Sequence, residues 1–266
     1  MILEAKSITK YYGGFCALND VDIGVYEGEF VSIIGPNGAG KTTLINVLTG
    51  FLTPDAGQVL FKGEDIAGKR PEKLTRLGIA RSFQLVNIFP ELSVIDTIKT
   101  AIISRDGKGM RFYANLIKDR QLHEQALEVA ELFGLADHLE EKSGNFPQGA
   151  KKLLDVASAF ALHPEIILLD EPTSGVSTSA KNKIMQVLMD ASKKIGIKTI
   201  LQVEHDMDIV FSYSDRIIAV QQGRILADGP PDKMKQDENV ICNVVGQKEC
   251  FKTFERIMSM NLQENG

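Results

Sequence analysis

Residues 30–43 read FVSIIGPNGAGKTT, an apolar run followed by a glycine-rich turn, a lysine and two threonines. The run predicts a buried strand, and the residues after Lys41 predict a helix. Between them, glycines allow successive backbone N–H groups to face one anion, and the positive end of the helix points at the same place. The stretch therefore predicts a phosphate-binding loop for a nucleoside triphosphate. A strand before it and a helix after it disfavour the alternative, a simple glycine turn.

The predicted loop gives its side chains and backbone separate tasks. Lys41 can reach the β and γ phosphates, and the hydroxyl of Thr42 can coordinate Mg²⁺. ATP and Mg²⁺ are thus the expected ligands. The predicted nucleotide-binding residues of the loop are Gly35, Pro36, Asn37, Gly38, Ala39, Gly40, Lys41, Thr42 and Thr43.

A second apolar run ends in two acids. Residues 166–169 read IILL and are followed by Asp170 and Glu171. An unbroken apolar run is typical of a buried parallel strand. We expect Asp170 to hold Mg²⁺, directly or through water, and Glu171 to orient the attacking water or accept its proton. The alternative, two acids in an ordinary turn, is disfavoured by the phosphate-binding loop upstream.

The order of apolar patterns predicts the fold class. Residues 2–30 alternate apolar and polar positions, which is typical of antiparallel strands with one solvated face. The pattern becomes helical from about Ser93, and after residue 166 strands and helices alternate. We therefore predict an α/β fold: a P-loop NTPase core with a mixed sheet, an N-terminal antiparallel β subdomain, and a helical subdomain inserted at about residues 93–160.

The end of the chain has a pattern of its own. Phe251, Phe254, Met258 and Leu262 recur at helical spacing, which predicts an amphipathic tail over residues 247–266. We expect this tail to pack on the core or on a partner rather than to lie on a membrane.

Charge and composition limit the partners. The 266 residues have a net charge of −5, which gives no general attraction to nucleic acid or to an anionic membrane surface. The N-terminus lacks the basic region and apolar stretch of a signal peptide, and no run approaches the roughly 18 apolar residues that span a bilayer. A cytosolic protein without a nucleic-acid partner is expected.

The motifs together resemble the ATP-binding subunits of ABC transporters. The set comprises the loop at 35–42, Gln84 after a strand, LLDEP at 168–172, and His205 within VEHD at 203–206. The resemblance covers residues 1 to about 246, the expected ATPase domain. More narrowly, LTGF at 48–51, GIARSFQ at 78–84, IFPELSV at 88–94 and EHDM at 204–207 resemble the branched-chain amino acid uptake ATPases.

The resemblance implies roles for further residues. Tyr12 would stack on adenine, with Tyr11 as its rival and a core tyrosine as the alternative. Gln84 would sense the γ-phosphate, metal and water while its loop receives the membrane subunit, and His205 would hydrogen-bond the γ-phosphate. The implied catalytic residues are Lys41, Gln84, Glu171 and His205, and the implied metal ligands are Thr42, Gln84 and Asp170.

One motif departs from the family pattern. Members usually carry Leu-Ser-Gly-Gly-Gln before the helix that precedes the acidic strand, and this signature contacts the ATP held by the opposite subunit. Here the positions are occupied by Phe146, Pro147, Gln148, Gly149 and Ala150. Proline has neither a hydroxyl nor an N–H, so the contact to the partner's phosphate should be weaker. Ser177 also stands where an aspartate or asparagine is commoner.

The implied function is an ATP hydrolase that energises a membrane ABC transporter, an importer of branched-chain amino acids or similar small polar solutes. Its partners would be transmembrane permease subunits, a second ATPase subunit in a hetero- or homodimer, and indirectly an extracytoplasmic solute-binding protein. It would lie on the cytoplasmic face of the cell membrane. Because of the altered signature, a nucleotide-gated binding module with little hydrolysis stays an alternative; a soluble ABC ATPase acting on nucleic acid is disfavoured by charge.

Overall fold

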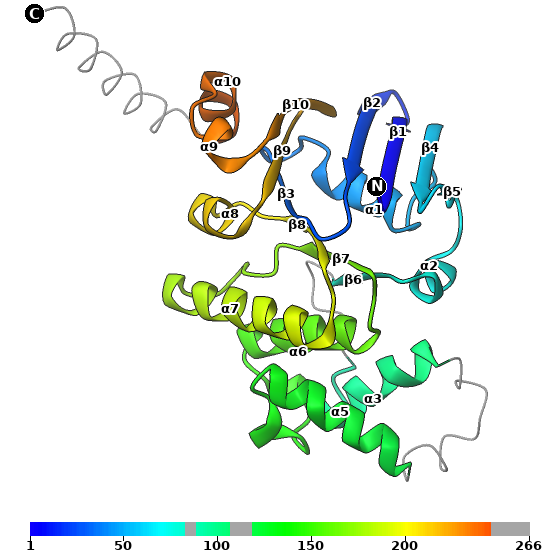
Figure 1. The fold of residues 1–266 in the computed structure, drawn as a ribbon, viewed down its shortest axis with the longest axis vertical. Coiled ribbons are helices and arrows are strands. Elements are labelled where there is room, and N and C mark those ends of the chain that lie inside the picture. The colour runs from blue at the N-terminus through cyan, green and yellow to red at the C-terminus, as the bar shows by residue number, and fades with distance from the viewer. Residues whose placement is uncertain (83–88, 107–118, 246–266) are drawn as a thin grey trace, which may run out of the picture.

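A mixed sheet forms the centre of the molecule (Figure 1), which the computed structural model describes for residues 1–82, 89–106 and 119–245. Its six strands in the described residues lie in the order β10-β9-β3-β8-β7-β6. All neighbours are parallel except the pair β9 and β10. The bounds are β3 (Phe30–Ile34), β6 (Ile79–Ser82), β7 (Ile166–Asp170), β8 (Thr199–Val203), β9 (Arg216–Gln221) and β10 (Arg224–Gly229).

The N-terminal part of the chain contributes to a second, antiparallel sheet, as its alternating apolar and polar residues predict. It has the order β2-β1-β4-β5, and Tyr12 pairs with Phe15 at the tip of the first hairpin. The bounds are β1 (Leu3–Tyr12), β2 (Phe15–Val25), β4 (Ala56–Phe61) and β5 (Glu64–Asp65). The predicted fold class, an α/β core with a mixed sheet and an antiparallel N-terminal sheet, is confirmed.

Helices surround the mixed sheet. Ser93 and Asp119 cap the starts of α3 and α5 with their side chains, which satisfies backbone N–H groups that have no partner inside the helix. The bounds are α1 (Lys41–Leu48), α2 (Pro71–Leu77), α3 (Val94–Arg105), α5 (Arg120–Leu132), α6 (Gln148–Ala161), α7 (Thr178–Ile195), α8 (Met207–Tyr213), α9 (Pro231–Met234) and α10 (Glu238–Val240). Turns of 3₁₀-helix span Ala136–His138 and Ser143–Asn145, and a π-helical turn spans Ile241–Val245.

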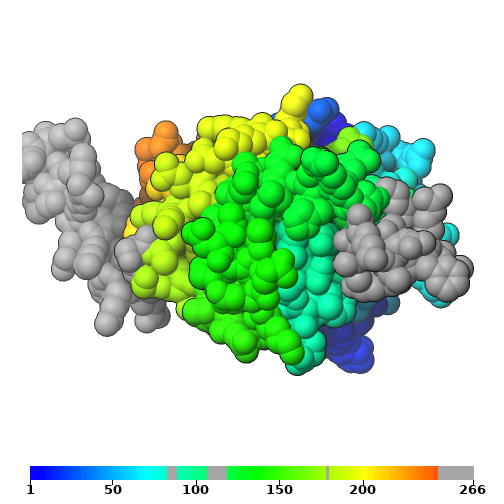
Figure 2. Space-filling model, turned by 90° about the horizontal axis from the view of Figure 1, so that it is seen from below, coloured from blue at the N-terminus to red at the C-terminus, as the bar shows by residue number. Residues whose placement is uncertain are grey.

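Two apolar cores lie on opposite faces of the mixed sheet. In β7, Ile167 and Leu169 pack with α3, α5, α6 and α7, whereas Ile166 and Leu168 pack with α1 and the antiparallel sheet. Successive side chains of a strand point to opposite faces, so a strand between two cores is apolar throughout. Seen from below, green residues of α5 fill the middle of the helical face between teal α3 and yellow-green α7 (Figure 2).

Some predictions fall outside the described residues. Gln84 and the predicted tail at 247–266 are among them, so their roles stay predictions. Across the described ranges, none of the helices combines the length and the apolar character that a bilayer crossing requires.

Candidate functional site

The phosphate-binding loop joins β3 to α1, and it can form only because two glycines occupy tight positions. Gly40 precedes the helix with φ of 104°, a left-handed conformation that glycine adopts without strain. A Cβ at Gly35 would lie 2.2 Å from the backbone oxygen of Val220, so a larger residue would push the loop away from β9. Beside the loop lies a pocket of about 280 Å³, lined by Tyr12, Phe15, Ala17, Asn37, Gly38, Ala39, Gly40, Lys41, Thr42, Thr43, Glu171 and His205.

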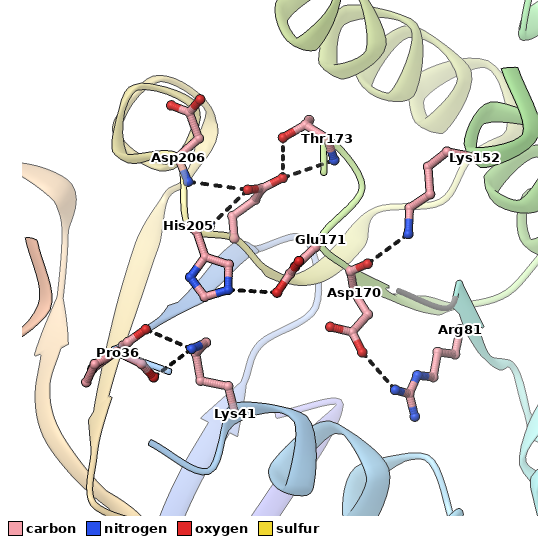
Figure 3. Close-up of polar contacts among 11 residues, drawn as sticks. Pro36, Lys41, Arg81, Lys152, Asp170, Glu171, Thr173, His205 and Asp206 are labelled. Carbon is pink, nitrogen blue, oxygen red and sulfur yellow. Dashed lines mark hydrogen bonds and ion pairs between the residues drawn. The ribbon is translucent and has the colours of Figure 1, made fainter. Parts of the chain in front are cut away.

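Lys41 lies in this pocket with its ammonium group turned onto the loop itself. Its Nζ donates to the carbonyl oxygens of Gly35 at 2.7 Å and Pro36 at 3.0 Å (Figure 3). Burial lowers the pKa of Lys41, while the charges of Glu171 and Asp170 oppose that shift. Two carbonyl groups thus hold the ammonium group of Lys41. A triphosphate would bind this group more strongly, because hydrogen bonds between a cation and a phosphate are stronger than those to neutral carbonyls.

Glu171 and His205 lie in the loops that follow β7 and β8, and they meet at the pocket. His205 Nε2 lies 2.7 Å from Glu171 Oε1. The backbone of Glu171 has φ of 50°, an uncommon conformation for a residue other than glycine, and its N–H donates to the carbonyl of Val203 at 2.9 Å. A carboxylate next to an imidazole, both facing a pocket, can orient a water molecule and accept its proton.

Asp170 lies behind the pocket in a nearly closed environment. Its Oδ2 accepts a hydrogen bond from Arg81 Nη2 at 2.9 Å, and its backbone carbonyl accepts one from Lys152 Nζ at 3.0 Å. The Arg81 and Asp170 side chains are 7% and 2% exposed. Burial is the main cause that lowers the pKa of Arg81 and of Lys152, and the nearby acids oppose both shifts.

A divalent cation fits this arrangement. Oδ1 of Asp170 is buried and has no hydrogen-bond partner among the described residues, which is costly for a charged group unless a cation or water satisfies it. Oδ2 is already bound to Arg81, so Oδ1 is the atom left for a metal. In the described ranges no group of three His, Cys, Asp or Glu residues could form a metal site alone. Mg²⁺ takes few protein ligands and completes its shell with phosphate oxygens and water, so a single free carboxylate oxygen is a sufficient anchor for it.

The pocket lining distinguishes the two tyrosines that were candidates for stacking on the adenine base. Tyr12 lines it and Tyr11 does not, although both are about half exposed. Phe15 lies opposite Tyr12 in the hairpin register and also lines the pocket. As a candidate for stacking on the base, Tyr12 is therefore better placed than Tyr11. Phe15 is a second aromatic candidate, which the sequence did not indicate.

The altered signature sits at the start of α6. Phe146 is buried and packs edge-on against the ring of His138, with centroids 5.6 Å apart. Pro147 occupies the N-cap position and Gln148 begins the helix, with both side chains exposed. No side chain of the described residues caps this helix. A Cβ at Gly149 would lie 3.0 Å from Val176, so the glycine allows close contact between α6 and the loop after β7.

Three charged residues around the site escaped the sequence reading: Arg81, Lys152 and Glu204. All three are buried or half-buried, and charged side chains are rarely buried unless paired. Arg81 stands in the short strand Ile79–Ser82, between buried neighbours. That placement is a usable signal, because a charge inside a buried strand demands a partner. Glu204 directly follows the buried strand β8 and carries a similar signal, whereas Lys152 lies in α6, where no local pattern of the sequence marks its burial.

Comparisons with known proteins agree with this geometry. A family model described as "ABC transporter" matches residues 18–174. The high-affinity branched-chain amino acid transport ATP-binding protein LivG of Escherichia coli is 34% identical, with 92% of this chain and 98% of that protein covered. A probable LivG of Methanocaldococcus jannaschii is 37% identical, with 86% and 89% covered.

Solved structures give the same result. A nucleotide-free ATP-binding cassette from an ABC transporter matches with a TM-score of 0.78 and 33% identity, over 91% of this chain and 97% of that one. A dimeric post-hydrolysis cassette bound to ADP and Pi matches with a TM-score of 0.74 and 27% identity, over 86% and 98%. On these grounds, and with the loop, the acidic strand end and the histidine in place, the chain belongs to the ABC transporter family as an ATP-binding, ATP-hydrolysing subunit.

Proposed function

We propose that this chain binds Mg²⁺ and ATP at the pocket beside α1 and couples hydrolysis to import of branched-chain amino acids or similar small polar solutes. The observation that carries the proposal is the convergence of Lys41, Glu171 and His205 on one pocket. The similarity of this chain to LivG of Escherichia coli, which covers 98% of that protein, supports the transport role.

Each residue has a task in this reaction. Backbone N–H groups of the loop and Lys41 bind the phosphates. A Mg²⁺ ion held at this site would supply positive charge to the phosphate oxygens during the reaction. Thr42 and Asp170 would hold the ion, Gln84 is proposed to join them, and Tyr12 is proposed to stack on the base. Glu171 orients the attacking water and takes its proton, and His205 donates to the γ-phosphate.

The proposed assembly places two ATPase subunits face to face beneath permease subunits, on the cytoplasmic side of the membrane. ATP bound to the loop of one subunit meets the start of α6 in the other. The dimeric cassette structure with ADP and Pi supports such a pairing. A solute-binding protein outside the membrane would deliver the transported molecule to the permease. We propose residues 1–246 as the ATPase domain, residues 93–160 as its helical insert and 247–266 as a separate tail.

Phosphate release from ATP tests the function. The purified chain is assayed with and without Mg²⁺, alone and mixed with the second ATPase subunit of its transporter, and ATP binding is measured separately. We expect Mg²⁺-dependent hydrolysis that rises on mixing. Binding without hydrolysis in both settings would contradict the proposal and favour a nucleotide-gated module.

The altered signature makes its own prediction. Pro147→Ser supplies a hydroxyl at an N-cap position where serine is preferred and offers the partner's phosphate one charge-assisted hydrogen bond. At about 1.5 kcal/mol or more for such a bond, hydrolysis by the chain alone should rise about tenfold. Steady-state phosphate release measures the change. Pro147→Ala, which loses the ring but gains no hydroxyl, is the matched control; equal rates for the two variants would contradict the prediction.

A further inference from the structure

The carboxylate of Glu204 joins the two loops that carry Glu171 and His205. Glu204 is 3% exposed. Its Oε1 accepts hydrogen bonds from Thr173 N at 3.1 Å and from Thr173 Oγ1 at 2.5 Å. Its Oε2 accepts from the backbone N–H groups of His205 at 2.9 Å and Asp206 at 3.4 Å. One side chain therefore binds the loop after β7 with one oxygen and the loop after β8 with the other.

These bonds reach both pocket residues. Thr173 lies two residues after Glu171, and His205 directly follows Glu204. Between the two loops the side chains of Glu171 and His205 meet at 2.7 Å (Figure 3). The carboxylate of Glu204, whose own side chain does not line the pocket, thus joins the two backbones under this contact, beyond the bond from the N–H of Glu171 to the carbonyl of Val203.

The outer side of the same loop has a second anchor. Asp206 Oδ2 accepts a hydrogen bond from Lys181 of α7 at 2.7 Å, and Asp206 Oδ1 caps the start of α8. Asp206 therefore fixes the loop after β8 to the helices. The loop after β7 is joined to it separately, through the two hydrogen bonds that Thr173 donates to the side chain of Glu204.

A fully bonded buried carboxylate is a costly way to join two loops. Removing a carboxylate from water costs free energy, which its hydrogen bonds must offset. What the carboxylate adds is a rigid pair of acceptors that take donors from both loops at once. One of the two loops that it joins contains Glu171, whose φ of 50° is a strained conformation.

We propose that Glu204 is a positioning residue for hydrolysis, which fixes Glu171 and His205 relative to one another and contributes little to ATP binding. The proposal rests on the function proposed above for Glu171 and His205. It predicts that losing the carboxylate lowers kcat and spares the affinity for ATP, because Lys41 and the phosphate-binding loop stay in place.

The decisive variant is Glu204→Gln in the full chain. The amide keeps the shape, but its NH₂ group is a donor that faces donors, so bonds to one loop are lost. We expect kcat to fall about 10- to 100-fold, the range for a small misplacement of reacting groups, while KM and the Kd of a fluorescent ATP analogue change less than about threefold. Thr173→Val should lower kcat, and Thr173→Ser, which keeps the hydroxyl, should restore it.

Asp215→Asn is the matched control. Asp215 Oδ2 accepts a hydrogen bond from Phe30 N at 2.9 Å, at the starts of β3 and β9, whereas Glu204 lies at the opposite end of the strands, just after β8. Asp215→Asn makes the same acid-to-amide change as Glu204→Gln and should leave kcat unaltered. An unchanged kcat in Glu204→Gln, or equal losses in kcat and in ATP affinity, would overturn the proposal.

Amide hydrogen exchange separates this proposal from the proposed function. Glu204→Gln should speed exchange of the N–H groups of Thr173, His205 and Asp206, and Asp215→Asn should not. If the wild-type chain fails to hydrolyse ATP, the proposed function fails, and the exchange rates still decide whether Glu204 holds the loops. Unchanged exchange at Thr173 and His205 would overturn the positioning role by itself.

Discussion

Glu171→Gln should lower kcat for ATP hydrolysis about 1,000-fold, within the 10²- to 10⁴-fold range for loss of a positioned general base. The amide cannot accept the proton of water, yet it keeps the size of the side chain. ATP affinity should stay close to that of the wild type, because the proposed phosphate contacts are made by Lys41 and the loop residues rather than by Glu171. Single-turnover phosphate release measures the rate, and a fluorescent ATP analogue measures the affinity.

The control for this variant is Glu141→Gln. Glu141 contacts His138 at 2.7 Å, the same distance as between Glu171 and His205, but lies on the surface and outside the pocket. Its replacement should leave kcat unchanged. A Glu171→Gln variant that keeps a tenth or more of the wild-type rate would remove Glu171 from the proposed role and point to another base.

Arg81→Ala should lower the free energy of unfolding by about 3–5 kcal/mol, because it leaves the carboxylate of Asp170 buried without its guanidinium partner. Arg81 also donates to Asn46 Oδ1 at 2.6 Å and Thr49 Oγ1 at 3.2 Å, and its guanidinium lies 5.4 Å from the centroid of the Phe51 ring. At roughly 2–4 °C per kcal/mol for a chain of this size, Tm should fall by roughly 10 °C. Thermal and urea unfolding measure the loss.

The matched control is Arg120→Ala. Its pair with Glu124 is 2.8 Å long, as short as that between Arg81 and Asp170, but the two side chains are 92% and 60% exposed. Exposed pairs contribute little, because water and ions screen them. An Arg81→Ala variant as stable as Arg120→Ala would show that Asp170 is satisfied by other groups.

Much of this molecule could be predicted from periodicity and spacing. The strand, loop and helix at residues 30–48 and the acidic strand end are local patterns, and the structure has them where the sequence places them. A shared site for Glu171 and His205 followed only from resemblance to a family, since no local rule brings residues 34 positions apart together, and their direct contact was not predicted. The partners of Arg81, Lys152 and Glu204 depend on strand order in the sheet, and burial of a charge signals that a partner exists without saying which.

At the left-handed turn of Glu171, the residue that is best for stability differs from the residue that hydrolysis requires. A conformation of this kind costs a residue with a side chain on the order of 1–3 kcal/mol, and glycine avoids that cost. A library of variants at position 171 sorted only for resistance to heat or protease should therefore enrich Glu171→Gly, and the enriched proteins should be robust and unable to hydrolyse ATP. Persistence of glutamate at this position would then record a history of selection for turnover rather than for durability.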